Sequence, residues 1–252
     1  MNIVIIGSGN VATHMGVALF QANNNILQVY SRQRENAIAL ANTINAQAIT
    51  DLNAIDQEAD LYIVSLKDDV LEDVIDLMPL LNGIVVHTAG SVPLSVLSRF
   101  DKYGVFYPFQ TFTKSAELIF RHVPILVESN DDEVFEKLWR LANSLSDTVL
   151  KANSKQRGHL HIAAVYACNF VNHMYRLADE VLKESELPFE LLHPLIAETA
   201  AKVQKMAPEA AQTGPAIRND QKIMDKHIDI LEGNDEWQGI YKALSESIIK
   251  RL

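Results

Sequence analysis

The first residues of the chain carry a glycine-rich turn with the spacing that phosphate binding requires. The segment Gly7–Ala12 reads GSGNVA, the pattern G-x-G-x-x-A, directly after a short apolar run and before an apolar helical pattern. Gly7 permits a sharp turn, and Gly9 leaves backbone amides open to a pyrophosphate at the positive end of the following helix. Dinucleotide binding is therefore predicted for Gly7, Ser8, Gly9, Asn10 and Val11. The alternative is a glycine turn that holds no ligand.

The residues after the next apolar run indicate which dinucleotide fits. NAD-binding sites usually carry Asp or Glu about 20 residues past the glycines, where the carboxylate holds the ribose 2′-hydroxyl. This chain has Ser31, Arg32 and Arg34 there, and no carboxylate. Two guanidinium groups and a hydroxyl suit a 2′-phosphate, so these three residues predict NADP(H). The alternative is that both arginines are surface charges at a helix start.

Small and polar residues follow three further apolar runs. Ligands of open α/β sheets bind at the carboxyl ends of the strands, so these residues are expected to lie near the cofactor and the substrate. The expected cofactor contacts are Ser65, Leu66, Lys67 and Thr88, and the expected substrate contacts are His87, Gly90, Ser91 and Gln110. His87 is a possible proton donor, although a lone histidine at a strand end is more often structural. The aromatic residues around Gln110 either wall a pocket or cap the core.

A long helical pattern from Ser154 to about Lys183 carries polar residues on an otherwise apolar helix. At about 100° per residue, His161, Asn169 and Asn172 fall on one arc. A helix that is apolar nearly all round is expected to be buried, and buried polar groups need partners. Those partners are either other side chains or a substrate in a cleft between domains.

The segment 213–220 interrupts the helical pattern near the end of the chain. It reads TGPAIRND and places a hydroxyl, backbone amides and the Arg218 guanidinium together. This combination suits a carboxylate or a phosphate, so Arg218 is a candidate anion-binding residue. The alternative is an ordinary turn between helices with a solvated arginine.

The elements that must position these residues change in kind near residue 152. Before it, apolar runs alternate with helical patterns; after it, the patterns are all helical. Strands are predicted over 3–6, 26–30, 47–50, 60–66, 84–86, 104–106, 124–127 and 148–150. The alternation predicts an α/β domain over 1–152, a Rossmann-type, doubly wound, mostly parallel sheet. Residues 153–252 are predicted to form an all-helical domain for substrate binding and dimerisation.

Composition narrows the class of protein. The 252 residues are 48% hydrophobic, enough for two domains with cores of their own. The net charge of −10 argues against a nucleic-acid partner. No apolar run approaches the roughly 18 residues of a membrane span, and no signal peptide is visible, so a cytoplasmic protein is expected. Cys168 is the single cysteine, and no metal site is predicted.

Several motifs together resemble a known family. They are GSGNVA, HTAGS, YPFQTF, HLHIAAVYACNFVNH and TGPAIRND, which span nearly the whole chain. Members of this family join a Rossmann domain to an uncharacterised all-helical C-terminal domain, and are named NADP oxidoreductases although their reaction is not established. The resemblance implies a fold and a cofactor, NADP(H), more than a substrate.

More distantly, the layout is similar to 6-phosphogluconate dehydrogenase, the 3-hydroxyacid dehydrogenases, pyrroline-5-carboxylate reductase and prephenate dehydrogenase. Their helical domain closes over the nicotinamide and often dimerises, which implies a homodimer here. The hydroxyacid dehydrogenases place a catalytic lysine four residues before an asparagine on the long helix. Here Val165 precedes Asn169 and Cys168 precedes Asn172 at that spacing. That lysine mechanism therefore does not carry over, and His161 becomes the candidate for proton transfer.

The leading hypothesis is an NADP-dependent oxidoreductase that transfers hydride between NADPH and a small, anionic carbonyl or imine compound. His161, Asn169 and Asn172 are its expected catalytic residues. An alternative, favoured by the missing lysine, is a non-catalytic NADP(H)-binding protein that senses redox state or binds a partner. A prephenate-dehydrogenase-like activity is a third possibility, and no residue points to an aromatic pathway.

Overall fold

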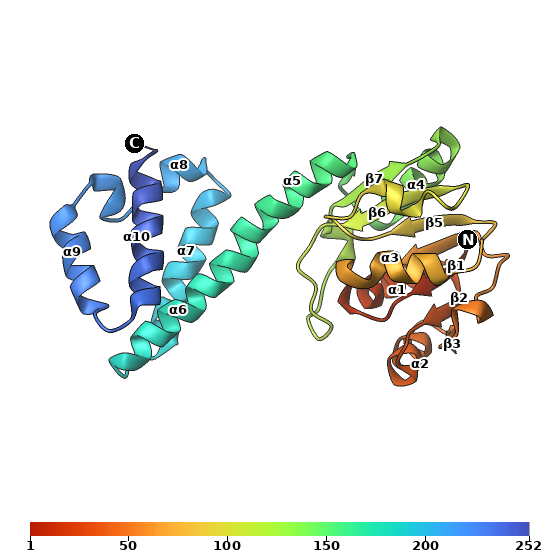
Figure 1. The fold of residues 1–252 in the computed structure, drawn as a ribbon, viewed down its shortest axis with the longest axis horizontal. Helices are drawn as coiled ribbons and strands as arrows, with labels where there is room; N and C mark the ends of the chain where they lie inside the picture. The colour runs from red at the N-terminus through yellow and green to blue at the C-terminus, as the bar shows by residue number, and fades with distance from the viewer. Residues whose placement is uncertain (252) are drawn as a thin grey trace. The chain divides into compact units, whose positions relative to one another are not determined.

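The computed structural model describes residues 1–251, which form two compact units (Figure 1). The first unit comprises Met1–Cys168 and the second begins at Asn169. The division lies inside the long helical stretch, some residues after the last strand ends at Lys151. The boundary predicted at 152/153 coincides with the change from strands to helices. That this position also divides the cofactor domain from the substrate domain stays a prediction.

The first unit is built on one eight-stranded sheet with the order β3-β2-β1-β4-β5-β6-β7-β8. All neighbouring strands run parallel except β6 and β7, which are antiparallel. The α/β fold and the mostly parallel sheet predicted from the sequence are therefore confirmed. The strands are β1 (Asn2–Ile6), β2 (Asn25–Tyr30), β3 (Gln47–Ile49), β4 (Leu61–Val64), β5 (Ile84–His87), β6 (Tyr103–Pro108), β7 (Ile125–Ser129) and β8 (Val149–Lys151).

Helices cover both faces of this sheet. Apolar residues of α1, α2 and α4 share one buried cluster with the sheet, and residues of α3 share the other. Strands buried on both faces explain the continuous apolar runs of β1 and β4. The helices of this unit are α1 (Asn10–Gln21), α2 (Arg34–Thr43), α3 (Asp68–Leu77), α4 (Asp132–Leu145) and α5 (Ser154–Ala164). Short 3₁₀ turns lie at Leu52–Ala54 (η1), Leu94–Leu97 (η2) and Phe120–His122 (η3).

Local signals explain where several elements begin and end. Asp131 caps α4, as predicted, because its carboxylate accepts hydrogen bonds from the backbone N–H groups of Glu133 and Val134. Pro108 is the last residue of β6, since it has no N–H to continue the ladder. The chain from β6 to β7 contains only a 3₁₀ turn. A parallel strand would need a crossover helix there, so β7 returns antiparallel.

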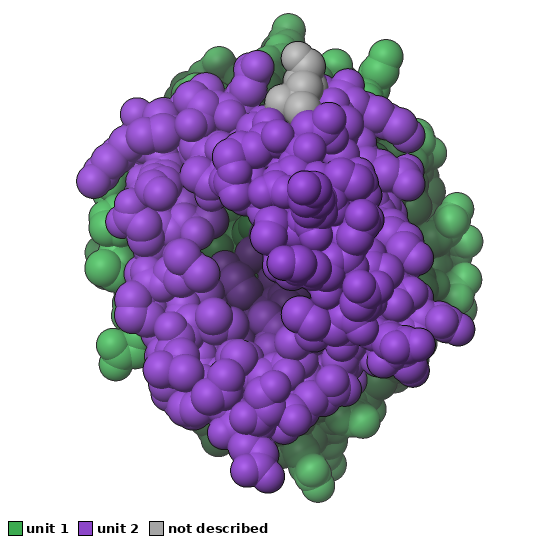
Figure 2. Space-filling model, turned by 90° about the vertical axis from the view of Figure 1, so that its left-hand side faces the viewer, with its two compact units in different colours: residues 1–168 green, residues 169–252 purple. Residues whose placement is uncertain are grey.

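The second unit is all helical. Its helices are α6 (Val171–Glu184), α7 (His193–Val203), α8 (Pro208–Ala211), α9 (Gln221–Ile230) and α10 (Asp235–Ile249), with 3₁₀ turns at Phe189–Leu192 (η5) and Ala216–Arg218 (η6). Figure 2 shows this unit in purple, with a hollow in the face turned to the viewer. Among apolar residues 169–251, only Ala216 and Met224 are buried. Within residues 169–251, the single chain therefore does not form the second well-buried core that its composition predicted.

The long helix differs from its prediction in two ways. The helix from Ser154 to Glu184 is continuous in sequence, but Val165–Phe170 is a π-helical segment between α5 and α6. The wider π turn changes which residues share a face, so the arc drawn from an ideal α-helix does not hold past Ala164. The expected burial is also wrong for the single chain, because Ile162 and Tyr166 are 57% and 67% exposed. Within residues 1–251, the structure contains no helix of the length and apolarity needed to span a membrane.

Candidate functional site

The glycine turn connects β1 to α1 in the way the sequence predicted. Gly7 has φ of +126°, and a Cβ there would lie 2.1 Å from the Ser65 carbonyl oxygen, so only glycine fits. A Cβ at Gly9 would meet nothing within 4 Å. Gly9 is the N-cap of α1 and supplies no side-chain cap, and the first turn of α1 contains no acidic residue. The first amides of α1 are therefore available to an anionic ligand.

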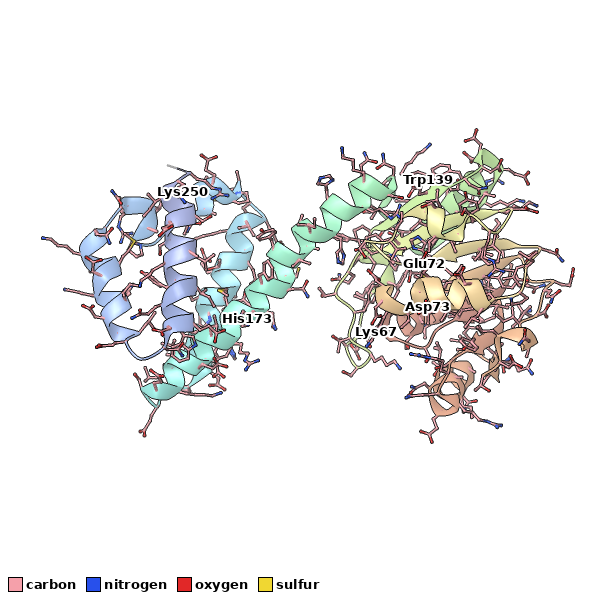
Figure 3. All side chains as sticks on the ribbon, viewed as in Figure 1. Lys67, Glu72, Asp73, Trp139, His173 and Lys250 are labelled. Atoms are coloured by element: carbon pink, nitrogen blue, oxygen red, sulfur yellow. The ribbon has the colours of Figure 1, made fainter. Side chains whose placement is uncertain are left out.

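A cavity of about 720 Å³ opens beside this turn. It brings together eight of the residues predicted to contact a cofactor, namely Gly7, Ser8, Gly9, Ser31, Arg32, Ser65, Leu66 and Lys67. The Ser8 hydroxyl donates to the Ser31 hydroxyl at 3.0 Å, which joins the loops after β1 and β2. Lys67, at the N-cap of α3, is labelled in Figure 3. Val70 and Val74 of α3 give the cavity an apolar side that the sequence analysis did not single out.

The remaining predicted cofactor contacts lie around this cavity. Arg34 is the exposed first residue of α2, next to the cavity residue Gln33. Val11 follows in the first turn of α1, while the Asn10 side chain donates to the Phe112 carbonyl at 2.8 Å and so ties the loop after β6 to the glycine turn. Thr88 is buried and donates to the Ser65 hydroxyl at 3.2 Å.

His87 is the last residue of β5 and is completely buried. Burial lowers its pKa from 6.5 to about 3, the positive charge of Arg157 acts in the same direction, and the Pro93 carbonyl opposes both. The ring is therefore neutral at physiological pH. Nδ1 accepts from the Ala89 N–H at 3.2 Å, so Nε2 carries the proton. This placement gives the ring no exposed atom for a substrate and favours its structural alternative.

Arg157 of α5 is the largest fully buried side chain among residues 1–251, and the sequence analysis missed it. Its guanidinium pairs closely with the Glu128 carboxylate of β7 and donates to the Val92 carbonyl at 2.8 Å. Burial lowers the pKa of Arg157 to about 10, so the group stays charged at neutral pH. The Ser154 hydroxyl donates to Glu128 and accepts from the Leu94 N–H. These bonds fasten the first turn of α5 to the sheet.

The predicted substrate contacts after β5 and β6 have specific local partners. The Ser91 hydroxyl donates to the Asp68 carboxylate at the start of α3. A Cβ at Gly90 would lie 2.7 Å from the Tyr107 hydroxyl oxygen, so Gly90 makes room for that ring. Gln110 is exposed, and its carbonyl oxygen accepts from the Thr111 N–H.

The predicted catalytic residues belong to both units. His161 lies on α5 in the first unit, and its Nδ1 is 3.4 Å from the Tyr107 hydroxyl oxygen. Asn169 lies in the π-helical segment and Asn172 in α6, both exposed in the second unit. Arg218 is also in the second unit, the exposed last residue of the 3₁₀ turn η6. The structure thus places His161 beside Tyr107, near the carboxyl end of β6. Asn169, Asn172 and Arg218 belong to the second unit.

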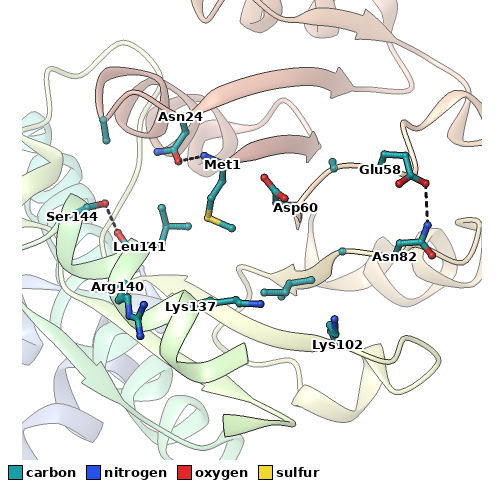
Figure 4. A pocket seen from close by; sticks show the side chains of 14 residues that line it. Met1, Asn24, Glu58, Asp60, Asn82, Lys102, Lys137, Arg140, Leu141 and Ser144 are labelled. Atoms are coloured by element: carbon teal, nitrogen blue, oxygen red, sulfur yellow. Dashed lines mark hydrogen bonds between the residues drawn. The ribbon is translucent and has the colours of Figure 1, made fainter. Parts of the chain in front are cut away.

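Another cavity, of about 690 Å³, lies at the opposite edge of the sheet (Figure 4). Met1, Asp60 and Lys102 line it at the amino ends of β1, β4 and β6. Ligands of open α/β sheets bind at the carboxyl ends, so the cavity beside Gly7 and Gly9 is the candidate site.

Comparison with known proteins identifies the class of this site. Residues 2–89 match a family described as NADP oxidoreductase, coenzyme F420-dependent, and residues 123–248 match a domain of unknown function, DUF2520. A crystal structure described as a putative NADP oxidoreductase from Bacteroides fragilis is 44% identical, with a TM-score of 0.90. The match covers 99% of this chain and 98% of that one. The chain therefore belongs to the same NADP oxidoreductase family as this Bacteroides fragilis protein. Among curated proteins, none matches its sequence.

More distant structures share the fold of this oxidoreductase. An imine reductase from Myxococcus stipitatus in complex with NADP⁺ is 15% identical, with a TM-score of 0.71 over 99% of this chain and 93% of that chain. A 1-pyrroline-5-carboxylate reductase from Streptococcus pyogenes is 14% identical, with a TM-score of 0.65 over 100% and 97% of the two chains. The resemblance to NADP oxidoreductases drawn from the motifs is confirmed by the Bacteroides fragilis match, and the distant similarity to pyrroline-5-carboxylate reductase is confirmed at the level of the fold.

The protein is an NADP-dependent oxidoreductase, and its candidate site fits that cofactor. The space before Gly9 and the uncapped start of α1 suit the pyrophosphate. Arg32 and Ser31 lie in the same cavity, where a 2′-phosphate would be held. An oxidoreductase family also favours the catalytic hypothesis over the redox sensor.

Proposed function

We propose that this oxidoreductase reduces the C=N or C=O bond of a small, anionic substrate with NADPH. The observation that carries the proposal is the cavity in which the glycine turn, Arg32 and the ends of β1, β2 and β4 meet. NADPH supplies the hydride when bound there. The protein binds the dinucleotide, orients the substrate and supplies a proton.

Each residue set has a proposed task. Gly7, Ser8, Gly9, Asn10 and Val11 hold the pyrophosphate, while Ser31, Arg32 and Arg34 hold the 2′-phosphate. Ser65, Leu66, Lys67 and Thr88 complete the cofactor contacts. Substrate contacts are assigned to Gly90, Ser91, Gln110 and Arg218, with His87 supporting them from the core. Proton transfer and substrate orientation are assigned to His161, Asn169 and Asn172.

The imine is the favoured substrate class. Two distant relatives of the same fold are an imine reductase and a pyrroline carboxylate reductase. The substrate in the name of the second enzyme, 1-pyrroline-5-carboxylate, is a cyclic imine that carries a carboxylate. A carboxylate is the kind of group that Arg218 is proposed to bind.

We further propose that the protein acts as a homodimer in the cytoplasm. The described part of the second unit buries only Ala216 and Met224 among its apolar side chains, yet exposes Leu191 and Leu195 by 61% and 64%. A second copy packed on these helices would supply the missing core. The functional domains are proposed to be 1–152 for NADP(H) and 153–252 for substrate and dimer contacts.

The proposed reaction is tested by NADPH oxidation with matched substrates. The two imines are 2-methyl-1-pyrroline and 1-pyrroline-2-carboxylate, which differ in the group at one carbon, and the carbonyl compounds are cyclohexanone and a 2-oxo acid. We expect saturable NADPH oxidation with the carboxylate imine. Arg218→Ala should raise KM for it about 10- to 100-fold, the worth of a charge-assisted hydrogen bond, and leave the methyl imine unchanged. No oxidation above background with all four compounds would contradict the proposal.

A further inference from the structure

Tyr107 lies near the carboxyl end of β6, in an aromatic stretch that the sequence predicts either to wall a pocket or to cap the core. Val105 of β6 pairs with His87 of β5, and Tyr107 stands two residues further toward the carboxyl edge. Side chains alternate along a strand, so Tyr107 shares its face of the sheet with Tyr103, which packs against the cluster containing α3. Tyr107 is thus at the edge where ligands of such sheets bind.

The Tyr107 phenol faces His161. Its oxygen is 3.4 Å from His161 Nδ1, and both residues belong to the first unit and are partly buried. Gly90 makes this position possible, because a Cβ at Gly90 would lie 2.7 Å from both Cζ and the hydroxyl oxygen of Tyr107. Gly90 therefore makes space for the phenol, in addition to its proposed contact with the substrate.

The buried ion pair beneath α5 explains why His161 points at the phenol. Arg157 and His161 are four residues apart and so lie on the same face of α5. Arg157 is fixed to Glu128 of β7 and to the Val92 carbonyl. Those bonds set the rotation of the helix about its axis. His161, one turn later, then meets the end of β6.

The surroundings of Tyr107 keep its phenol protonated. Burial raises the pKa of Tyr107, the negative charge of Asp68 raises it further, and Arg157 acts in the opposite direction. A phenol that retains its proton at neutral pH can give it to the strongly basic atom that forms when a C=N or C=O bond accepts hydride.

We propose that Tyr107 is the catalytic proton donor of this site and that His161 is the positioning residue that returns a proton to it. The proposal rests on the proposed reductase function. NADPH gives hydride to the carbon of the double bond, and the substrate nitrogen or oxygen takes the Tyr107 proton. The O–H bond of the phenol breaks, and its electron pair stays on the phenol oxygen. The Nδ1–H of His161 then gives its proton to that oxygen while Nε2 takes a proton from solvent water, and exchange of the ring protons with water restores the Nδ1–H before the next turnover.

The test compares Tyr107→Phe with Tyr103→Phe, which removes a phenol hydroxyl from the same face of β6 outside the site. With 1-pyrroline-2-carboxylate and NADPH, Tyr107→Phe should lower kcat by about 10²- to 10⁴-fold, the usual share of a general acid. KM and the calorimetric affinity for NADPH should stay unchanged, since the proton moves only in the transition state. Tyr103→Phe should behave as wild type. Equal kcat values for the two variants would overturn the proposal.

A second readout requires no turnover. The ¹⁵N resonance of His161 Nδ1, recorded with and without NADP⁺, should shift in Tyr107→Phe and in Gly90→Ala, and stay in place in Tyr103→Phe. An unmoved resonance in Tyr107→Phe overturns the pairing, whatever the substrate. Failure of the proposed function has a different signature. Wild type would then bind NADPH and reduce none of the four compounds, while the Nδ1 resonance would still differ between wild type and Tyr107→Phe.

Discussion

The position of His87 in the sheet lowers the pKa of its imidazole far below the value usual for histidine. The histidine is the last residue of a central strand that pairs with β4 and β6, and its side chain is completely buried. Burial, assisted by the charge of Arg157, keeps the imidazole neutral. The sequence could identify the strand end at residue 87, but it could not show that the ring turns into the core.

The pKa of His87 makes a prediction about acid stability. The pKa of His87 is about 3 in the folded protein and an ordinary 6.5 in the unfolded chain, so between these values the unfolded chain binds the extra proton. The free energy of unfolding should therefore fall as pH drops from 6.5 toward 3, by up to about 1.4 kcal/mol per pH unit from this residue. Urea unfolding at a series of pH values measures this slope, which should be shallower in His87→Gln.

The control for this prediction is His122→Gln, because His122 is an exposed histidine of the same unit. Its slope should match that of wild type. Parallel slopes for wild type and His87→Gln would show that the His87 ring does not gain its proton on unfolding.

Residue pairs distant in the sequence explain why part of the site was missed. The turn at Gly7 and Gly9 is encoded locally, and the pattern predicted its place and its neighbours correctly. Tyr107 meets His161 across 54 residues, and Arg157 meets Glu128 across 29. No spacing rule links such pairs, because the fold alone brings them together.

At the scale of elements, the first turn of α5 depends on its buried ion pair. Arg157 has no exposed surface and Glu128 is only 17% exposed, so removing one partner leaves a buried charge without compensation. We expect Arg157→Met to lower the free energy of unfolding of the protein by about 3–5 kcal/mol, measured by urea titration.

An exposed ion pair in the same unit provides the matched control. Arg121 and Asp147 pair at 2.7 Å, with side chains 55% and 53% exposed. Arg121→Met should cost only about 0–1 kcal/mol, because water already screens that pair. Similar losses in the two variants would mean that Arg157 is no more important to the fold than a surface arginine.

The strands and most helix boundaries could be predicted, because apolar runs and caps such as Asp131 are local signals. The π-helical segment Val165–Phe170 could not. Its residues have ordinary helical preferences, and nothing in their order marks the wider turn. The helix faces that an ideal α-helix assigns to Asn169 and Asn172 therefore differ from those in the structure.

At the scale of the whole molecule, the described part of the second unit buries only two apolar side chains, Ala216 and Met224, in the single chain. The sequence predicted its helices from their periodicity, but periodicity does not distinguish burial within one chain from burial between two. The second unit exposes several large apolar side chains, among them those of Leu191, Leu195, Ile230 and Leu244. Exposed apolar surfaces of this kind are typical of the interfaces of oligomers.

Light scattering tests the proposed homodimer. The wild-type mass should be twice the 28.1 kDa of one chain at micromolar concentration. Leu195→Glu places a charge on the exposed apolar face of α7 and should reduce the mass toward one chain, while Leu77→Glu, on the exposed side of α3 in the first unit, should leave it unchanged. A wild-type mass of one chain would contradict the dimer.

We propose that the cavity beside Gly7 and Gly9 binds NADP(H) through Arg32. Calorimetric titration of NADPH and NADH into wild type, Arg32→Ala and Arg140→Ala tests it most directly, because Arg140 lines the cavity at the opposite edge of the sheet. Wild type and Arg140→Ala should bind NADPH more tightly than NADH by about 10- to 100-fold, and Arg32→Ala should lose that preference by weakening NADPH alone. Equal affinities of wild type for the two nucleotides, or an Arg32→Ala variant that keeps the preference, would contradict this account of the site.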